Sequence, residues 1–226
     1  MISVLIWCYS RQKMLDLTLA GWLKQESVDF EIVLGVGPGI VTSPTGPINS
    51  VIVDTPDCKM GKAYNAMMAA AHGDMLLITQ SDMEVNSPTQ LRRMLDLWEP
   101  GKMVNEVFFK EGKRFAPPVF LQCMLVEKSL VVNAGAWDEF YDDGYAYEDS
   151  SLVSRMLSAG GSFVFLETDD KEGVYHIDHE KPNINDKDVT SRLNRNKAYY
   201  HAHHAESIME KYAKGILTAR KVRHIV

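Results

Sequence analysis

Cysteine is scarce in the 226-residue sequence, and its placement excludes two classes of small protein. The three cysteines, Cys8, Cys58 and Cys123, lie far apart, without the short spacing of zinc ligands. An odd number with no pairing pattern is typical of buried thiols in a reducing compartment. We therefore expect neither a zinc-binding domain nor a secreted domain held together by disulfides.

Long apolar runs are also missing. The apolar run at residues 2–7 directly follows Met1, lacks a preceding basic region and a cleavage site, and is too short for a signal peptide. No other run reaches the roughly 18 apolar residues of a membrane-spanning helix. These absences predict a cytoplasmic protein without a transmembrane segment.

Positive charge is in deficit over the whole chain but in excess at its end. The net charge is −6, which gives no general attraction to nucleic acid or anionic membranes. From Lys187 onward, nine Lys and Arg stand against three Asp and Glu. Eight of these basic residues are interleaved with Tyr and His: Arg192, Arg195, Lys197, Lys211, Lys214, Arg220, Lys221 and Arg223. The segment is either a solvated basic helix or a binding surface for an anionic partner, such as nucleic acid or a membrane surface.

The first part of the chain alternates strand-like and helical patterns. Buried-strand patterns at residues 2–7, 30–34, 51–53 and 75–79 are separated by helical patterns at 13–25 and 60–71. Val, Ile and Leu-rich strands separated by helices predict a mostly parallel sheet covered on both faces. Ligands of such sheets bind at the carboxyl ends of the strands.

Later segments complete an α/β fold. We expect a helix from Pro88 to about Trp98, an antiparallel excursion with a strand at 119–126, a helix at 148–159 and a strand at 162–167. The predicted organisation is one catalytic domain at residues 1–180 and a basic, helical C-terminal extension at 181–226 that packs on it.

Two acidic motifs could carry chemistry. Asp82 directly follows a predicted strand, where a carboxylate can hold Mg²⁺ or Mn²⁺ beside a diphosphate; an ordinary turn or cap residue is the alternative. Glu148 and Asp149 open a predicted helix, where a carboxylate could act as a general base or simply benefit from the helix dipole.

Two further motifs are less specific. His176 and His179 are three residues apart, so on a strand they cannot point the same way, and we expect one metal ligand rather than two; which one is open, and a structural role is the alternative. The segment at 61–65, with Lys62 and Asn65, opens a helix and could approach a nucleotide, or it is a loop glycine with a solvated lysine.

The order of these motifs resembles the family-2 glycosyltransferases of the GT-A fold over residues 1–180. Of the six segments that carry the resemblance, residues 8–11 correspond to the family's opening strand with Tyr-Asn-Arg, and residues 61–74 correspond to its G-x-A-x-N segment. Gln80–Asp82 stand at its Asp-x-Asp metal motif, and residues 135–139 stand at its Gly-Gly-Phe-Asp-Glu turn. Residues 148–155, with Arg155, match its E-D-x-x-L-x-x-R signature, and His176 matches its late histidine.

The resemblance implies an inverting transfer from a nucleotide-sugar donor, with Mn²⁺ or Mg²⁺ as cofactor. Asp82 would be the main metal ligand and His176 a second one. Asp149 would be the catalytic base, and Glu148 would orient the acceptor. The residues implied beside the nucleotide are Tyr9, Arg11, Lys62, Asn65 and Gln80.

The sequence departs from the family at two places. Gln80 replaces the first Asp of the metal motif, and residues 35–38 read Gly-Val-Gly-Pro where the family has an Asp that reads the base. A UDP-sugar is therefore the default donor, with a GDP-sugar open. A non-catalytic sugar- or nucleotide-binding module is one alternative, and a nucleotidyltransferase, which needs a Gly-rich loop after the first strand, is another. The acceptor is a glycan, lipid-linked or modified nucleic-acid hydroxyl, bound by the loop at 102–122 and the C-terminal extension.

Overall fold

The computed structural model describes residues 1–41, 50–55, 57, 59–106, 108–110, 113–115, 121–168, 172–179 and 186–204. Cys58, Pro117, Pro118 and the basic residues after position 204 lie outside these ranges, so the expectations placed on them are not addressed by the structure. Cys8 and Cys123 are buried and free, as the cysteine pattern predicts.

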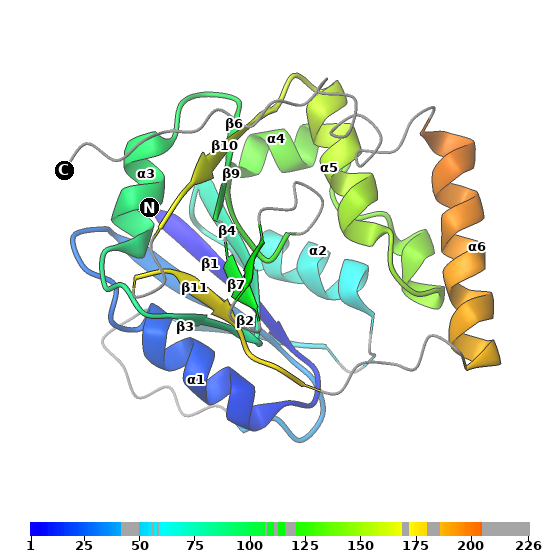
Figure 1. The fold of residues 1–226 in the computed structure, drawn as a ribbon, viewed down its shortest axis with the longest axis horizontal. Coiled ribbons are helices and arrows are strands. Elements are labelled where there is room, and N and C mark those ends of the chain that lie inside the picture. Colours follow the sequence, from blue (N-terminus) through cyan, green and yellow to red (C-terminus); the bar gives the residue numbers. More distant parts are fainter. Residues whose placement is uncertain are drawn as a thin grey trace.

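The core of the molecule is a seven-stranded sheet with the order β10-β6-β9-β4-β1-β2-β3 (Figure 1). The strands are β1 (Ile2–Cys8), β2 (Phe30–Val36), β3 (Ser50–Asp54), β4 (Met75–Gln80), β6 (Lys102–Glu106), β9 (Cys123–Glu127) and β10 (Ser162–Leu166). Only β9 among them runs antiparallel to its neighbours, β4 and β6. The expected mostly parallel sheet and its antiparallel excursion are both present.

Both faces of this sheet are buried, which explains the continuous apolar runs. Along β1, Val4 and Ile6 point into one core cluster and Leu5 points into the other. The first cluster includes residues of α1 (Gln12–Trp22) and α3 (Gln90–Leu97). The second is covered by α2 (Met60–Ala70), α4 (Lys128–Asn133) and α5 (Glu148–Ser158). Figure 1 shows these two helical layers on either side of the strands.

A small second sheet was not predicted from the sequence. It has the order β5-β11-β7-β8, from β5 (Met83–Val85), β7 (Phe108–Lys110), β8 (Lys113–Phe115) and β11 (Val174–His176). Each strand has only three residues, too few for an alternating pattern to be recognised. This sheet matters for the site because β5 begins immediately after Asp82 and β11 ends at His176.

The chain continues after the second sheet into α6 (Lys187–His203), which lies at the edge of the molecule beyond α5 (Figure 1). It packs beside a short 3₁₀ helix, η1 (Glu139–Asp143), to which it donates hydrogen bonds from Arg195 and Asn196. The helical extension is therefore present at least to His203. None of the helices in the described ranges is long and apolar enough to span a bilayer.

Candidate active site

The candidate active site opens where β1 and β4 end side by side. The two strands are parallel, with Trp7 opposite Gln80, so the residues that follow them meet at the same edge of the sheet. They enclose a cleft of about 210 Å³. The cleft is lined by Trp7, Tyr9, Ser10, Arg11, Met60, Gln80, Ser81 and Asp82.

Asp82 is held rigidly at the base of this cleft. The Thr18 hydroxyl of α1 donates to the Ser81 carbonyl at 2.9 Å, and the Ile177 amide donates to the Asp82 carbonyl at 2.8 Å. In the β5–β11 ladder, His176 lies opposite Met83. The second sheet therefore brings the segment around residue 176 against a carboxylate almost a hundred residues earlier in the chain.

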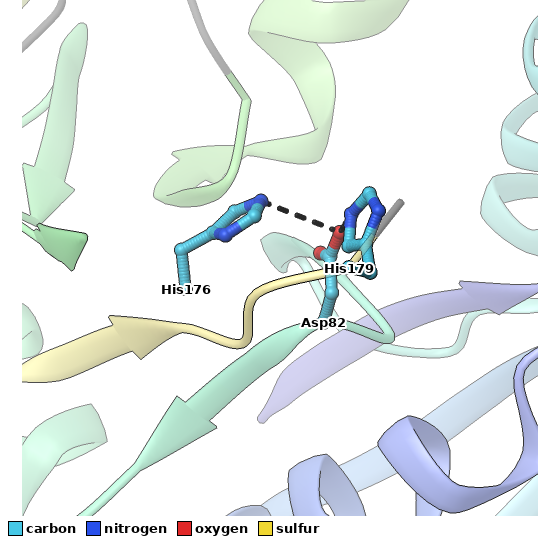
Figure 2. A group of neighbouring side chains, drawn as sticks. All are labelled: Asp82, His176 and His179. Atoms are coloured by element: carbon cyan, nitrogen blue, oxygen red, sulfur yellow. Dashed lines mark hydrogen bonds and ion pairs between the residues drawn. The ribbon is translucent and has the colours of Figure 1, made fainter. Parts of the chain in front are cut away.

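Asp82, His176 and His179 form a three-residue cluster (Figure 2). Asp82 Oδ2 lies 3.6 Å from His176 Nε2 and 2.9 Å from His179 Nε2. One possible ligand atom from each of the three residues lies within 4.8 Å of those of the other two. The expectation that the two histidines cannot face the same point is wrong. It assumed a continuous strand, whereas β11 ends at His176 and the chain bends before His179.

The donor atoms of the cluster fit a divalent cation. The carboxylate is a preferred ligand of Mn²⁺ and Mg²⁺, and the two imidazoles suit first-row transition ions. Asp82 Oδ1 is also buried without a hydrogen-bond partner among the described residues, and a buried carboxylate oxygen is costly unless something binds it. His176 is buried and His179 is nearly so, which limits their freedom to move away.

Arg11 reaches the same cluster from the loop after β1. Its Nη1 lies 3.0 Å from His179 Nε2 and 3.8 Å from Asp82 Oδ2. The side chain remains 41% exposed, so it can reorient at little cost. Its guanidinium places positive charge in the lining of the cleft beside Asp82.

Glu148 and Asp149 are the first two residues of α5, as predicted. Burial raises the pKa of Asp149 well above its ordinary value, and the negative charge of Glu148 raises it further. The Leu121 amide donates to Asp149 Oδ2 at 3.4 Å and opposes the shift only in part. Burial also raises the pKa of Glu148. A raised pKa makes a carboxylate a stronger base, which suits a group that accepts a proton.

Tyr64 of α2 is buried within range of the charges of both Asp82 and Asp149. Burial raises the pKa of its phenol well above the usual value, and the charges of Asp149 and Asp82 add to that shift. The hydroxyl donates to the Thr79 carbonyl at 2.6 Å, and the ring stacks on Trp137 with the centroids 4.9 Å apart. The charges of both Asp82 and Asp149 therefore act on one buried side chain.

The residues that were predicted to lie beside the nucleotide do not all line the cleft. Tyr9, Arg11 and Gln80 line the cleft, but Lys62 and Asn65 are not part of its lining. Lys62 is exposed. The Asn65 amide accepts from the Trp137 amide and donates to the Trp137 carbonyl, both at 3.0 Å, which makes Asn65 a support for the turn at 135–139.

Arg155 supports the same turn. Its Nη1 donates to the Ala134 carbonyl at 2.5 Å, just before Gly135, whose φ of +84° is accessible mainly to glycine. The E-D-x-x-L-x-x-R pattern thus begins with two carboxylates of raised pKa, Glu148 and Asp149, and ends with a structural arginine.

Some residues of the site were not anticipated from the sequence. Trp7, Ser10, Met60 and Ser81 line the cleft. The only signal for them was their position next to predicted strand ends or a helix start. That His179 joins the cluster could not be recognised, because nothing in the sequence marks the end of β11.

The observed features are a mostly parallel sheet, a cluster of metal-ligand type after the carboxyl end of β4, and a pair of carboxylates with raised pKa values at the start of α5. No protein-family model and no curated protein matches the sequence. Solved structures do match.

The crystal structure of S. aureus TarS matches with a TM-score of 0.62 and 16% identity, over 78% of this chain and 36% of that one. TarS 1–349 in complex with UDP-GlcNAc matches with a TM-score of 0.67 and 15% identity, over 94% of this chain and 69% of that one. The mannosyltransferase PcManGT from Pyrobaculum calidifontis, in complex with GDP-Man and Mn²⁺, matches with a TM-score of 0.59 and 13% identity, over 97% of this chain and 65% of that one.

The predicted fold class is therefore confirmed: the chain has the glycosyltransferase fold. It spans about a third of the TarS chain and about two thirds of PcManGT.

Proposed function

We propose that the protein is a metal-dependent, inverting glycosyltransferase that moves a sugar from a nucleotide-sugar donor to an acceptor hydroxyl. The observation that carries the proposal is the convergence of His176 and His179 on Asp82, which lines the cleft at the ends of β1 and β4. The structural neighbours TarS and PcManGT, which were solved with UDP-GlcNAc and with GDP-Man and Mn²⁺, support the donor class.

The residues divide the work between donor and acceptor. Asp82, His176 and His179 would hold Mn²⁺ or Mg²⁺, which when bound neutralises charge on the departing nucleoside diphosphate. Tyr9 and Gln80 line the cleft beside the nucleotide, and Arg11 contributes positive charge at the diphosphate. UDP is the donor nucleotide that we propose.

Asp149 would take the proton of the acceptor hydroxyl as that oxygen attacks the anomeric carbon. The bond between the anomeric carbon and the diphosphate oxygen breaks in the same displacement, and its electrons leave with the nucleotide. One displacement inverts the anomeric configuration, and no enzyme nucleophile is needed. Glu148 would orient the acceptor, which we propose to be a glycan, lipid-linked or modified nucleic-acid hydroxyl.

A panel of UDP- and GDP-sugars tests the proposal, with Mn²⁺, with Mg²⁺ and with EDTA. Release of nucleoside diphosphate that needs the metal and is abolished by Asp82→Ala is the expected result. Metal-dependent binding of a donor without any turnover, even with acceptors, would instead identify a binding module. Release of pyrophosphate from a nucleoside triphosphate would identify a nucleotidyltransferase.

A further inference from the structure

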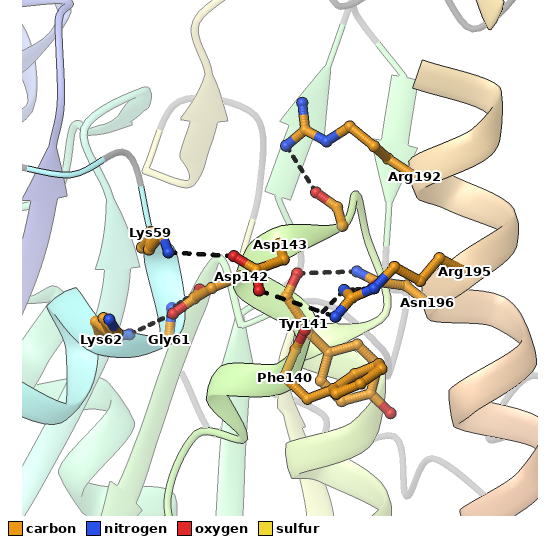
Figure 3. Close-up of polar contacts among 11 residues, drawn as sticks. Lys59, Gly61, Lys62, Phe140, Tyr141, Asp142, Asp143, Arg192, Arg195 and Asn196 are labelled. Atoms are coloured by element: carbon orange, nitrogen blue, oxygen red, sulfur yellow. Dashed lines mark hydrogen bonds and ion pairs between the residues drawn. The ribbon is translucent and has the colours of Figure 1, made fainter. Parts of the chain in front are cut away.

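Helix α6 docks on the segment at residues 140–147, which leads directly into α5 (Figure 3). Arg192 Nη2 donates to the Gly144 carbonyl at 2.8 Å, and Arg195 Nη1 donates to the Phe140 carbonyl at 2.9 Å. The Arg195 guanidinium also lies 4.0 Å above the Phe140 ring. The helix thus binds the backbone of this segment, so its contacts fix where the segment runs.

Asn196 is at the centre of these contacts. Its side chain is fully buried, and its Nδ2 donates to the Tyr141 carbonyl at 3.0 Å and to the Ala146 carbonyl at 2.8 Å. An amide nitrogen has two hydrogens, so both donors are used. Its Oδ1 accepts from Arg195 Nη1 at 3.2 Å. A single side chain therefore ties the two ends of the turn together.

The backbone that Asn196 holds is strained. Ala146 and Tyr147 have φ values of +61° and +76°, a left-handed conformation that residues other than glycine rarely adopt. Such conformations persist only where the surrounding structure enforces them, and they concentrate at functional sites. Tyr147 is the N-cap of α5, yet its side chain makes no capping bond. The start of α5 is thus set by contacts from outside that helix.

The close approach at Gly144 points the same way. A Cβ at this position would collide with the Asn196 side chain, so glycine is required for the contact. On the opposite side, the segment is joined to the start of α2, because Asp142 accepts from the amides of Gly61 at 2.6 Å and Lys62 at 2.9 Å (Figure 3). The segment is therefore fixed between α2 and α6.

We propose that Asn196, assisted by Arg192, is a positioning residue for the carboxylate pair Glu148 and Asp149. The inference rests on the proposed transferase function. Asn196 holds Ala146 and Tyr147 in their strained conformation, and these residues aim the first turn of α5 at the acceptor. The C-terminal extension thereby completes the acceptor half of the site, whereas the donor cleft is built entirely from earlier residues.

The test compares Asn196→Ala and Asn196→Asp with Asn194→Ala, an exposed position on the same helix. Asp has the shape of Asn but cannot donate to the two carbonyls. We expect both Asn196 variants to lower kcat for transfer by about tenfold or more, since small misplacements of reacting groups are costly. The affinity for UDP with Mn²⁺, measured by calorimetry, should stay within about twofold, and Asn194→Ala should match the wild type in both measurements.

Hydrogen exchange gives a readout that does not depend on activity. Amides at 145–151 should exchange faster in the Asn196 variants than in Asn194→Ala, while amides of β1 and β4 stay unchanged. Arg192→Ala, at an exposed position, should show the same effects more weakly and serves if the Asn196 variants do not fold.

The outcomes separate the two claims. An unchanged kcat in folded Asn196 variants, or a loss of UDP affinity equal to the loss of kcat, would overturn the positioning role. If the wild type transfers no sugar from any donor, the proposed function fails, and hydrogen exchange at 145–151 alone tests whether Asn196 positions the start of α5. Faster exchange in the Asn196 variants supports that role, and equal exchange overturns it.

Discussion

At the scale of single residues, the two histidines near Asp82 lead to a direct prediction. His176→Ala and His179→Ala should each raise the Mn²⁺ concentration needed for half-saturation by about tenfold or more, because even outer-shell groups change metal affinity by about 10- to 100-fold. Titration of free Mn²⁺ by electron paramagnetic resonance measures this without a donor. His203→Ala, at an exposed position on α6, is the matched control. A titration unchanged by His179→Ala would leave His176 as the one histidine ligand.

The carboxylate pair leads to a second prediction, about rate and pH. Asp149→Asn is nearly isosteric, so it should keep UDP affinity while lowering the transfer rate by about 10² or more. The pKa of Asp149 is raised, and a base works only when ionised. As the pH is lowered, the transfer rate of the wild-type protein should therefore begin to fall well above pH 4, the pKa region of an ordinary carboxyl group. Retention of the full rate in Asp149→Asn would place the base elsewhere.

At the scale of secondary structure elements, Glu31 connects three elements at the end of the sheet opposite the cleft. At the start of β2, it accepts from the Ser3 hydroxyl at 2.5 Å and the His72 amide at 2.6 Å, and its Oε2 lies 2.9 Å from His72 Nδ1. Burial alone would raise its pKa, but the hydrogen bonds from Ser3 and His72 outweigh burial, and the pKa of Glu31 is lowered. One buried carboxylate thus connects β1, β2 and the α2–β4 turn.

A lowered pKa stabilises the fold above the pKa of the unfolded chain, and this contribution is lost as pH falls through the folded value. Glu31→Gln should therefore lower the free energy of unfolding at pH 7 by about 1.5–3 kcal/mol, the usual contribution of hydrogen bonds to a charged group. The difference from wild type should shrink as the pH falls below the ordinary glutamate value of 4.5 and through the lowered pKa of Glu31. Urea unfolding measures it, with the exposed Glu26→Gln as control. A pH-independent difference would contradict the assignment.

How far the sequence predicts the elements depends on their length. Six of the seven strands of the main sheet and the helix that carries Glu148 follow from apolar periodicity, because both faces of that sheet are buried. The exception is β6, which lies within the segment 102–122 that was expected to be a loop. The three-residue strands β5 and β11 carry no such pattern, yet their ladder brings His176 to Asp82. The ends of elements were predicted less well: α1 ends at Trp22 rather than Gln25. Gln25 instead accepts from the Leu91 amide and so caps α3.

At the scale of the whole molecule, the basic C-terminal segment divides into two parts. Residues 187–203 form α6, whose Arg192 and Arg195 bind backbone carbonyls of the body. At the end of this helix, His204 Nε2 lies 3.2 Å from the Ser151 hydroxyl of α5. The remaining basic residues, Lys211, Lys214, Arg220, Lys221 and Arg223, lie outside the described ranges. A truncation that tests for an anionic partner must therefore spare α6.

We expect the full chain to bind duplex DNA or anionic vesicles at low salt, and to release them steeply as salt approaches physiological strength. Truncation after His204 should remove this binding and leave metal-dependent donor turnover intact. Gel shift and vesicle co-sedimentation distinguish the two partners. If the full chain binds neither at low salt, the excess of basic residues has no anionic partner of these kinds.

The ring nitrogen of His179 that faces Asp82 also faces Arg11. Under the proposed function, this shared position would make metal and donor binding thermodynamically linked. The positive charge of the Arg11 guanidinium near Asp82 would repel a bound cation. A diphosphate that draws the guanidinium away from Asp82 would remove this repulsion. Reciprocity then requires that the donor strengthen metal binding by the same factor as the metal strengthens donor binding. An affinity measured for either one is therefore meaningful only together with the concentration of the other.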